Sequence, residues 1–255
     1  EYHVGSNTIL LLHMKEAGGG IVYDAGSHGN NGTAAGTSNS NGRFGRARYN
    51  AAASSVVNIP NAPSLRFGIG PFTAEAWINT LDTTQISGHF HSFPGTTGPS
   101  WYNTIQANGS LSFSVKAASG VERAYGTKSV VDGKWHHIAC VRGQSSISIY
   151  LDGVLDGTRT IPSSMDIDND GPLLIGYQGG NPYPVKGLID EVRISNKARS
   201  PEEFNLQLPP KSLSATGSAT AVSLTWQNGG GASPILRYRI YRGTDSTTVA
   251  LIDST

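Results

Sequence analysis

Short runs in which apolar and polar side chains alternate recur through most of the chain. Residues 146–151 (SISIYL) are the clearest case, because every second residue is Ile or Leu. A period of two is typical of a half-buried β-strand. The Asp152-Gly153 pair that follows predicts a tight hairpin turn. Further short apolar runs are predicted to be strands at 8–14, 47–50, 54–60, 72–80, 110–117, 135–142, 172–177 and 187–195.

A helical pattern appears briefly near residue 200. In SPEEFNLQL (200–208), Ser200 is a predicted N-cap, Pro201 fits the first turn, and Glu203 stands at capping-box spacing. The Pro-Pro pair at 209–210 then breaks the chain. We therefore expect a short helix that closes the first structural unit.

The composition agrees with an all-β chain. The 255 residues include 32 glycines and 13 prolines, which favour many tight turns. Charged residues make up 15% and the formal net charge is +1, so the chain offers no basic field for nucleic acid. Cys140, the single cysteine, lies in an apolar run and is expected to be a small buried hydrophobe.

The sequence contains no apolar stretch of 18 residues, so no membrane insertion is expected. It begins at Glu1 without a signal peptide, which indicates a mature or trimmed chain.

The order of the strand motifs resembles that of the laminin G-like, concanavalin A-like jelly-roll family. The similarity is carried by VYDAGSHGNNGT, RFGRARYN, FTAEAWI, DGKWHHIACVR, ISIYLDGVLDG and GLIDEVRISNKARSPEEF. It covers residues 1–207 and implies a two-sheet antiparallel jelly-roll sandwich, closed by pairing of 8–14 with 187–195. Both Ile189 and Val192 are expected to face inward, which requires a bulge near Asp190. The other predicted inward positions are Leu10, Leu12, Ala76, Ile78, Ile138, Cys140, Ile149 and Leu151.

The tail, residues 208–255, resembles the first half of a fibronectin type III module, an immunoglobulin-like sandwich. PPKSLSAT, AVSLTWQNGGG and ILRYRIYRG match its opening strands, with Trp226 and Tyr238 as the implied core aromatics. A sandwich of this kind needs roughly 90–100 residues, so the later strands are missing. Either the rest of the module lies outside this chain, or residues 209–255 pair with a neighbouring chain in self-association.

Two adjacent histidines, His136 and His137, lie on a predicted strand. Successive strand residues point to opposite faces, so these two rings cannot easily converge on one metal ion. We expect one ring to pack inward and the other to be hydrated.

A calcium site is suggested by the loop DAGSHGNNGT, which begins at Asp24. Carboxylate, amide and carbonyl oxygens are the ligands that calcium prefers. The family resemblance implies that Asp24 and Asp190 bind one structural calcium ion, with Asn31 and the carbonyl of His28 contributing. The alternative is that Asp24 and the asparagines simply hydrogen-bond a turn.

The acidic loop 166–171 (DIDNDG) copies the opening of an EF-hand but lacks the glutamate at position twelve, where Tyr177 stands. It is interpreted as a solvated loop, with weak surface calcium binding as the alternative.

An aromatic cluster in 88–103 (GHFHSFPGTTGPSWYN) is predicted to be a long exposed loop that recognises a ligand. Exposed rings stack on sugars or on peptide side chains. The candidate binding residues are His89, His91, Trp101 and Tyr102, with Tyr183 on a neighbouring loop. Two alternatives stay open: the rings cover the edge of the sandwich, or His89 and His91 bind a transition metal.

Catalytic motifs are scarce. Glu75 and Glu122 stand apart, and Glu191 is expected on the opposite side of its strand from Asp190, so the carboxylate pair of a retaining glycosidase is missing. We therefore predict a non-catalytic binding or adhesion module of a secreted or cell-surface multidomain protein, which could accompany an enzyme domain. Its expected partner is a carbohydrate or an extracellular protein. The alternative is a structural or assembly subunit whose C-terminal strands pair with another chain.

Overall fold

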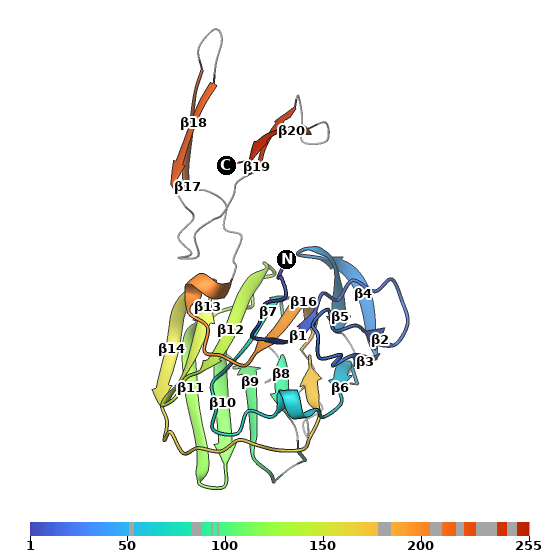
Figure 1. Ribbon diagram of the computed structural model, residues 1–255, viewed down its shortest axis with the longest axis vertical. Coiled ribbons are helices and arrows are strands. Elements are labelled where there is room, and N and C mark those ends of the chain that lie inside the picture. Colours follow the sequence, from blue (N-terminus) through green and yellow to red (C-terminus); the bar gives the residue numbers. More distant parts are fainter. Residues whose placement is uncertain are drawn as a thin grey trace. The chain divides into compact units, whose positions relative to one another are not determined.

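Two antiparallel sheets packed face to face form the first of two units (Figure 1). The units are Glu1–Arg199 and Ser200–Thr255. The structure is a computed structural model. It describes residues 1–50, 54–82, 88–92, 94–95, 97–177, 185–204, 211–217, 222–227, 239–243 and 249–254.

Sheet I has eight strands. Seven of them follow one another in a continuous order, and the eighth, β1, pairs with β16 outside that order. In spatial order the other strands are β14 (Val154–Thr160), β13 (Ser146–Leu151), β12 (His136–Arg142), β7 (Phe72–Thr80), β16 (Gly187–Ser195), β5 (Gly45–Asn50) and β4 (Thr37–Gly42). Strand β1 spans Thr8–Leu12, and Leu12 pairs with Val192. The predicted closure of the sandwich by its first and last strands is confirmed.

Sheet II also has eight strands. Their spatial order is β11 (Gly120–Ser129), β10 (Ser110–Ala117), β9 (Ser100–Ile105), β8 (Phe90–Ser92), β15 (Leu173–Ile175), β6 (Val56–Ile59), β3 (Gly32–Ala35) and β2 (Ile21–Val22). A short 3₁₀ helix, η1, spans Pro63–Leu65.

The core between the sheets contains all ten predicted inward positions, and each is at most 5% exposed. The turn after β13 is the expected hairpin, since Asp152 and Gly153 have positive φ angles of 51° and 78°. The bulge in β16 is confirmed as well, because its register against β7 shifts between Asp190 and Arg193 and Glu191 has a φ of 51°. Cys140 is buried as expected, and burial raises the pKa of its thiol.

The short helix that was expected to close the first unit is a 3₁₀ helix, η2, over Pro201–Phe204, and it lies at the start of the second unit. The backbone N–H of Ser200 donates to Oε2 of Glu203 (3.2 Å), which is one half of the expected capping box. Two hairpins follow: β17 (Lys211–Gly217) with β18 (Val222–Gln227), and β19 (Arg239–Gly243) with β20 (Val249–Ser254).

The resemblance of this tail to fibronectin type III, and its self-association, stay predictions. Trp226 falls within β18, whereas Tyr238 lies outside the described residues. Within the described part of the chain, no helix is long and apolar enough to cross a membrane.

Candidate functional site

Trp101 and Tyr102 are neighbours on β9 and point to opposite sides of sheet II. Trp101 is 2% exposed and its ring centroid lies 4.7 Å from that of Phe72, inside the core. Tyr102 is half-buried on the outer face. The prediction of one long exposed loop is wrong here, because Phe90–Ser92 and Ser100–Ile105 are strands whose alternation sends every second ring inward.

The outer face of sheet II carries a row of side chains contributed by four neighbouring strands. His91 pairs with Tyr102, Tyr102 with Ser114, and Ser114 with Arg123. Directly paired residues of antiparallel strands share a face, so these side chains lie side by side. The rings of His91 and Tyr102 are 5.1 Å apart.

Arg123 is the centre of this row. Its Nε donates to Oγ of Ser114 (2.6 Å) and its Nη2 donates to the hydroxyl of Tyr102 (2.9 Å). The guanidinium carbon lies 5.7 Å from the ring centroid of Tyr102 and 5.8 Å from that of Tyr125. Tyr125 is 56% exposed. We call Tyr102, Ser114, Arg123 and Tyr125 the tyrosine–arginine row.

A second polar group adjoins the row, since Ser112 is the strand partner of Tyr125. The hydroxyls of Thr104 and Ser112 are 2.8 Å apart, and Nε2 of Gln106 donates to both (2.7 and 2.8 Å). The outer face therefore combines aromatic rings with hydroxyl and amide groups that are already held in place.

Arg123 and Tyr125 are not among the predicted site residues, because no strand is predicted over residues 120–129. The signal was present, since Val121, Arg123 and Tyr125 alternate with residues of the opposite face. A hairpin partner for 110–117 would have placed both side chains beside Tyr102.

The two predicted histidine ligands are buried and have different partners. Nδ2 of Asn103 donates to Nδ1 of His89 (3.0 Å), while His91 lies against Tyr102. Burial lowers the pKa of His89 to about 3 and that of His91 to about 4, so both are neutral at pH 7. Tyr183 lies outside the described residues, and a ligand-binding role for the histidines stays a prediction.

Asp24 has backbone N–H groups around its carboxylate. Oδ1 accepts hydrogen bonds from Leu11 (2.9 Å) and Gly26 (2.8 Å), and Oδ2 accepts one from Asn30 (2.9 Å). Oδ1 of Asn31 accepts the N–H of Asp24 itself (2.9 Å). These are the contacts of a hydrogen-bonded turn, and three donors face the position that a cation would need.

Asp190 differs, because it is fully buried and one of its oxygens is unused. Oδ2 accepts the N–H of Phe44 (2.9 Å), and Oδ1 has no partner among the described residues. Burial raises the pKa of this carboxyl to about 6. Gly42 leaves room for it, since a Cβ there would come within 2.6 Å of Oδ2. Asp190 thus has one acceptor oxygen available to a cation, whereas the carboxylate of Asp24 already accepts three backbone N–H groups.

The two carboxylates of the predicted calcium bridge belong to segments on either side of β1. Asp24 forms a bridge with Leu12, which in turn pairs with Val192 of β16. A shared calcium ion at Asp24 and Asp190 stays a prediction.

A buried network covers the outer face of sheet I. Nε of Arg193 donates to Oε1 of Glu75 (2.8 Å), and Nε2 of His137 lies 3.2 Å from Oε2 of Glu75. The guanidinium of Arg193 is 4.2 Å from the ring centroid of Tyr2. Burial alone would raise the pKa of Glu75, but Arg193 and His137 outweigh it and hold this pKa below its usual value.

The adjacent histidines therefore differ in burial as expected, but the buried ring lies on the outer face of sheet I beside Tyr2 and not between the sheets. His137 is fully buried in this network, and His136 is partly exposed between Asp152 (2.8 Å) and Asp132 (3.0 Å).

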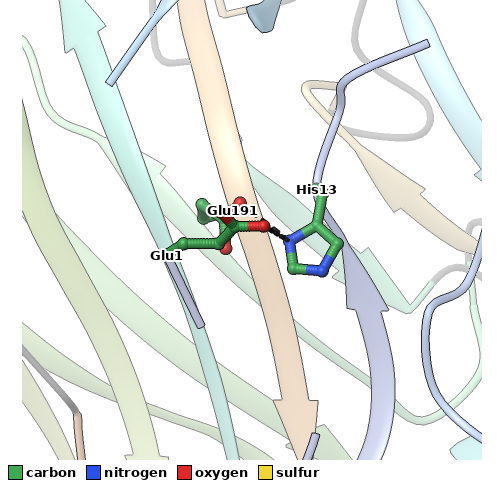
Figure 2. Close-up of side chains that lie close together, drawn as sticks. All are labelled: Glu1, His13 and Glu191. Carbon is green, nitrogen blue, oxygen red and sulfur yellow. Dashed lines mark hydrogen bonds and ion pairs between the residues drawn. The ribbon is translucent and has the colours of Figure 1, made fainter. Parts of the chain in front are cut away.

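Beside this network, Glu1, His13 and Glu191 bring three potential metal ligands together (Figure 2). The ring of His13 points at Glu191, with Nδ1 at 2.8 Å from Oε1. Oε2 of Glu191 accepts the N–H of Tyr2 (2.7 Å), and the ammonium of Lys15 lies 2.6 Å from Oε1 of Glu1. The carboxylates already have positive or donor partners, so the cluster is a salt-bridge network.

Comparison with known proteins gives a family and a set of similar folds. A family model described as the concanavalin A-like lectin/glucanases superfamily matches residues 50–205, more than half of the chain. Among curated proteins, none matches.

Similar solved structures include domain 4 of AbnA, a GH43 extracellular arabinanase from Geobacillus stearothermophilus, in complex with arabinotriose. It has a TM-score of 0.63 and 18% identity, over 77% of this chain and 96% of that one. The binding domain of Paraclostridial Mosquitocidal Protein 1 has a TM-score of 0.65 and 14% identity, over 96% and 67%. The ligand binding domain of botulinum neurotoxin serotype D in complex with N-acetylneuraminic acid has 0.62 and 13%, over 96% and 68%. At these identities the likeness shows the fold.

Proposed function

The chain belongs to the concanavalin A-like lectin/glucanases superfamily, and from this premise we propose that it is a non-catalytic carbohydrate-binding module of a secreted or cell-surface protein. Its binding surface is the tyrosine–arginine row on the outer face of sheet II. The observation that carries the proposal is the pair of tyrosine rings on either side of Arg123. Aromatic faces pack against the apolar faces of sugar rings, while fixed donors bind hydroxyls.

The similar folds support this proposal. The arabinanase domain holds an arabinose oligosaccharide, and the neurotoxin domain holds a sialic acid. The arabinanase is an extracellular enzyme, which fits a module that acts outside the cell and accompanies another domain.

Two tyrosine substitutions test the proposed surface. Binding of a panel of plant and animal oligosaccharides would be measured by calorimetry for the native chain, Tyr102→Ala and Tyr125→Ala. We expect each variant to lose at least tenfold in affinity for the sugars that the native chain binds. Tyr49→Ala is the matched control, because Tyr49 is 42% exposed on β5 of sheet I. Equal losses in all three variants would contradict the proposal.

A structural calcium ion at Asp190 is a second, separate part of the proposal. Its support is the buried Oδ1 without a partner, since hard oxygen ligands suit calcium. Asp24 is left out of this part because its oxygens accept three backbone N–H groups. When bound, the ion would neutralise a buried carboxylate. The test is given below with the other stability measurements.

A further inference from the structure

Arg123 has no acidic partner among the described residues, unlike three other arginines of the sandwich. Arg66, Arg159 and Arg193 lie 2.6–2.8 Å from the carboxylates of Asp168, Glu122 and Glu75, respectively. Within the described part of the chain, the hydrogen bonds of Arg123 go to the hydroxyls of Ser114, Tyr102 and Tyr125, and none goes to a carboxylate. Its positive charge is therefore not neutralised by the protein itself.

The strands around Arg123 contribute no negative charge to the same face. Strands β8 to β11 contain one acidic residue, Glu122. Alternation turns Glu122 away from Arg123, and its carboxylate is bonded to Arg159 (2.8 Å). Lys116 stands two residues beyond Ser114 on β10, on the side that carries the row. Among the described residues of these four strands, the face that carries the row thus holds Arg123 and Lys116 and no carboxylate.

The guanidinium is also held in position before any ligand arrives. Ser114 and Tyr102 fix two of its nitrogens, and the rings of Tyr102 and Tyr125 lie close to its carbon. A planar guanidinium matches a carboxylate with two parallel hydrogen bonds. Because the side chain is already ordered, it loses less conformational entropy on binding.

We propose that the tyrosine–arginine row selects carbohydrates that carry a carboxylate, the group found in uronic acids and sialic acids. This inference rests on the proposed carbohydrate-binding function. The carboxylate pairs with Arg123, and the sugar ring packs against Tyr125 and the exposed part of Tyr102. The positive charge of Lys116 adds electrostatic attraction for an acidic oligosaccharide.

The test compares acidic sugars with their neutral counterparts on the full chain. One pair is trigalacturonate and its methyl ester, and the other is sialyllactose and lactose; the two pairs separate uronic acids from sialic acids. Calorimetry at low salt should give at least tenfold tighter binding of the acid in one pair. Raising the salt to about 0.3 M should weaken binding of the acid more than that of the neutral sugar.

Arg123→Gln should abolish this preference, because the acid loses its guanidinium partner and its binding weakens more than that of the neutral sugar. Arg159→Gln is the control, because it removes the same charge from an arginine that is already paired with Glu122 at the surface. This variant should keep the preference for the acid. Circular dichroism melts confirm that both variants fold. Arg123→Lys keeps the charge without the planar fork and should retain only part of the preference.

The outcomes separate the two proposals. Equal binding of acidic and neutral sugars, lost in Tyr102→Ala, overturns the carboxylate inference and leaves carbohydrate binding in place. A preference for the acid that survives in Arg123→Gln overturns the inference too. If neither these sugars nor the wider oligosaccharide panel bind, both proposals fail.

Discussion

Charged side chains on the outer faces of the two sheets have different partners and different exposure. On sheet I, Glu75, Arg193 and His137 are buried and bonded to one another, and Tyr2 packs over the guanidinium. On sheet II, Arg123 is partly exposed and bonded to hydroxyls alone. A charge that is fully paired inside the protein has little left to offer a ligand, whereas a fixed and unneutralised cation does. We therefore expect the first face to stabilise the fold and the second face to bind the ligand.

The largest expected effect comes from breaking the buried network of sheet I. Glu75→Ala leaves Arg193 buried without its carboxylate, which costs about 3–5 kcal/mol of unfolding free energy in comparable buried pairs. Urea titration followed by fluorescence measures this cost.

Glu122→Ala is the matched control for that loss. Glu122 is paired with Arg159 at the surface, so its removal should cost about 1 kcal/mol or less. If both glutamate variants lost the same small amount, the picture of a sealed structural face would be wrong.

Trp101 and Tyr102 provide the next test, since these neighbours point to opposite sides of sheet II. Trp101→Ala removes a ring packed on Phe72 and should cost about 3–5 kcal/mol of stability. Tyr102→Ala should leave the unfolding midpoint close to that of the native chain and reduce sugar affinity. Paired urea titrations and calorimetric binding curves separate the two effects. Loss of binding by a fully stable Trp101→Ala variant would contradict this assignment.

The stabilising effect of calcium is expected to depend on Asp190 and not on Asp24. An ion that binds only the folded state adds about 2.7 kcal/mol at a hundredfold excess over Kd. Calcium should therefore raise the melting temperature of the native chain but not of Asp190→Asn. In chelator at pH 8 we expect this variant to be at least as stable as the native chain, because a buried charge is removed.

Asp24→Asn is the companion variant. It loses one acceptor oxygen among three N–H donors and should cost about 1–3 kcal/mol with or without calcium. A native chain whose melting temperature is the same in calcium and in chelator would rule out the structural ion.

Alternation and turn residues predicted most of the strands of the first unit, because they are local properties of the chain, while the two-sheet sandwich was implied by the family resemblance. Ile189 and Val192 even located the bulge of β16, since two inward residues at an odd spacing leave no regular alternative. The residues of the candidate site were harder to predict from the sequence than the strands. Glycines and prolines in 88–103 suggested a loop, yet Phe90 and Trp101 belong to strands.

The sequence pattern does not show which distant strands pair with each other. Arg123 lies beside Tyr102 only because β11 pairs with β10 and β10 with β9. Likewise, the contact of Arg193 with Glu75 depends on the register of β16 against β7. Single-sequence reasoning identifies strands but not their neighbours.

Acid should destabilise the chain through the buried histidines near sheet II. His89 and His91 have pKa values lowered to about 3 and about 4 by burial, against an ordinary value near 6.5. Below pH 6.5 the unfolded chain binds more protons, so stability falls between pH 7 and pH 5, by about 2 kcal/mol for each histidine. Urea titrations at pH 7 and pH 5 should show this loss, and His89→Gln should reduce it. An unchanged pH dependence in that variant would contradict the assignment.

His136 should act in the opposite direction and with the smallest effect. Its hydrogen bonds to Asp152 and Asp132 raise its pKa, so its ion pairs are complete below about pH 6.5 and are lost as the pH rises through the raised value. Because these partners lie at the surface, we expect about 0.5 kcal/mol. Stability of the native chain and of His136→Gln, measured by urea titration between pH 6 and pH 9, should converge at the alkaline end. A constant difference between the two chains would mean that His136 contributes by packing and not by charge.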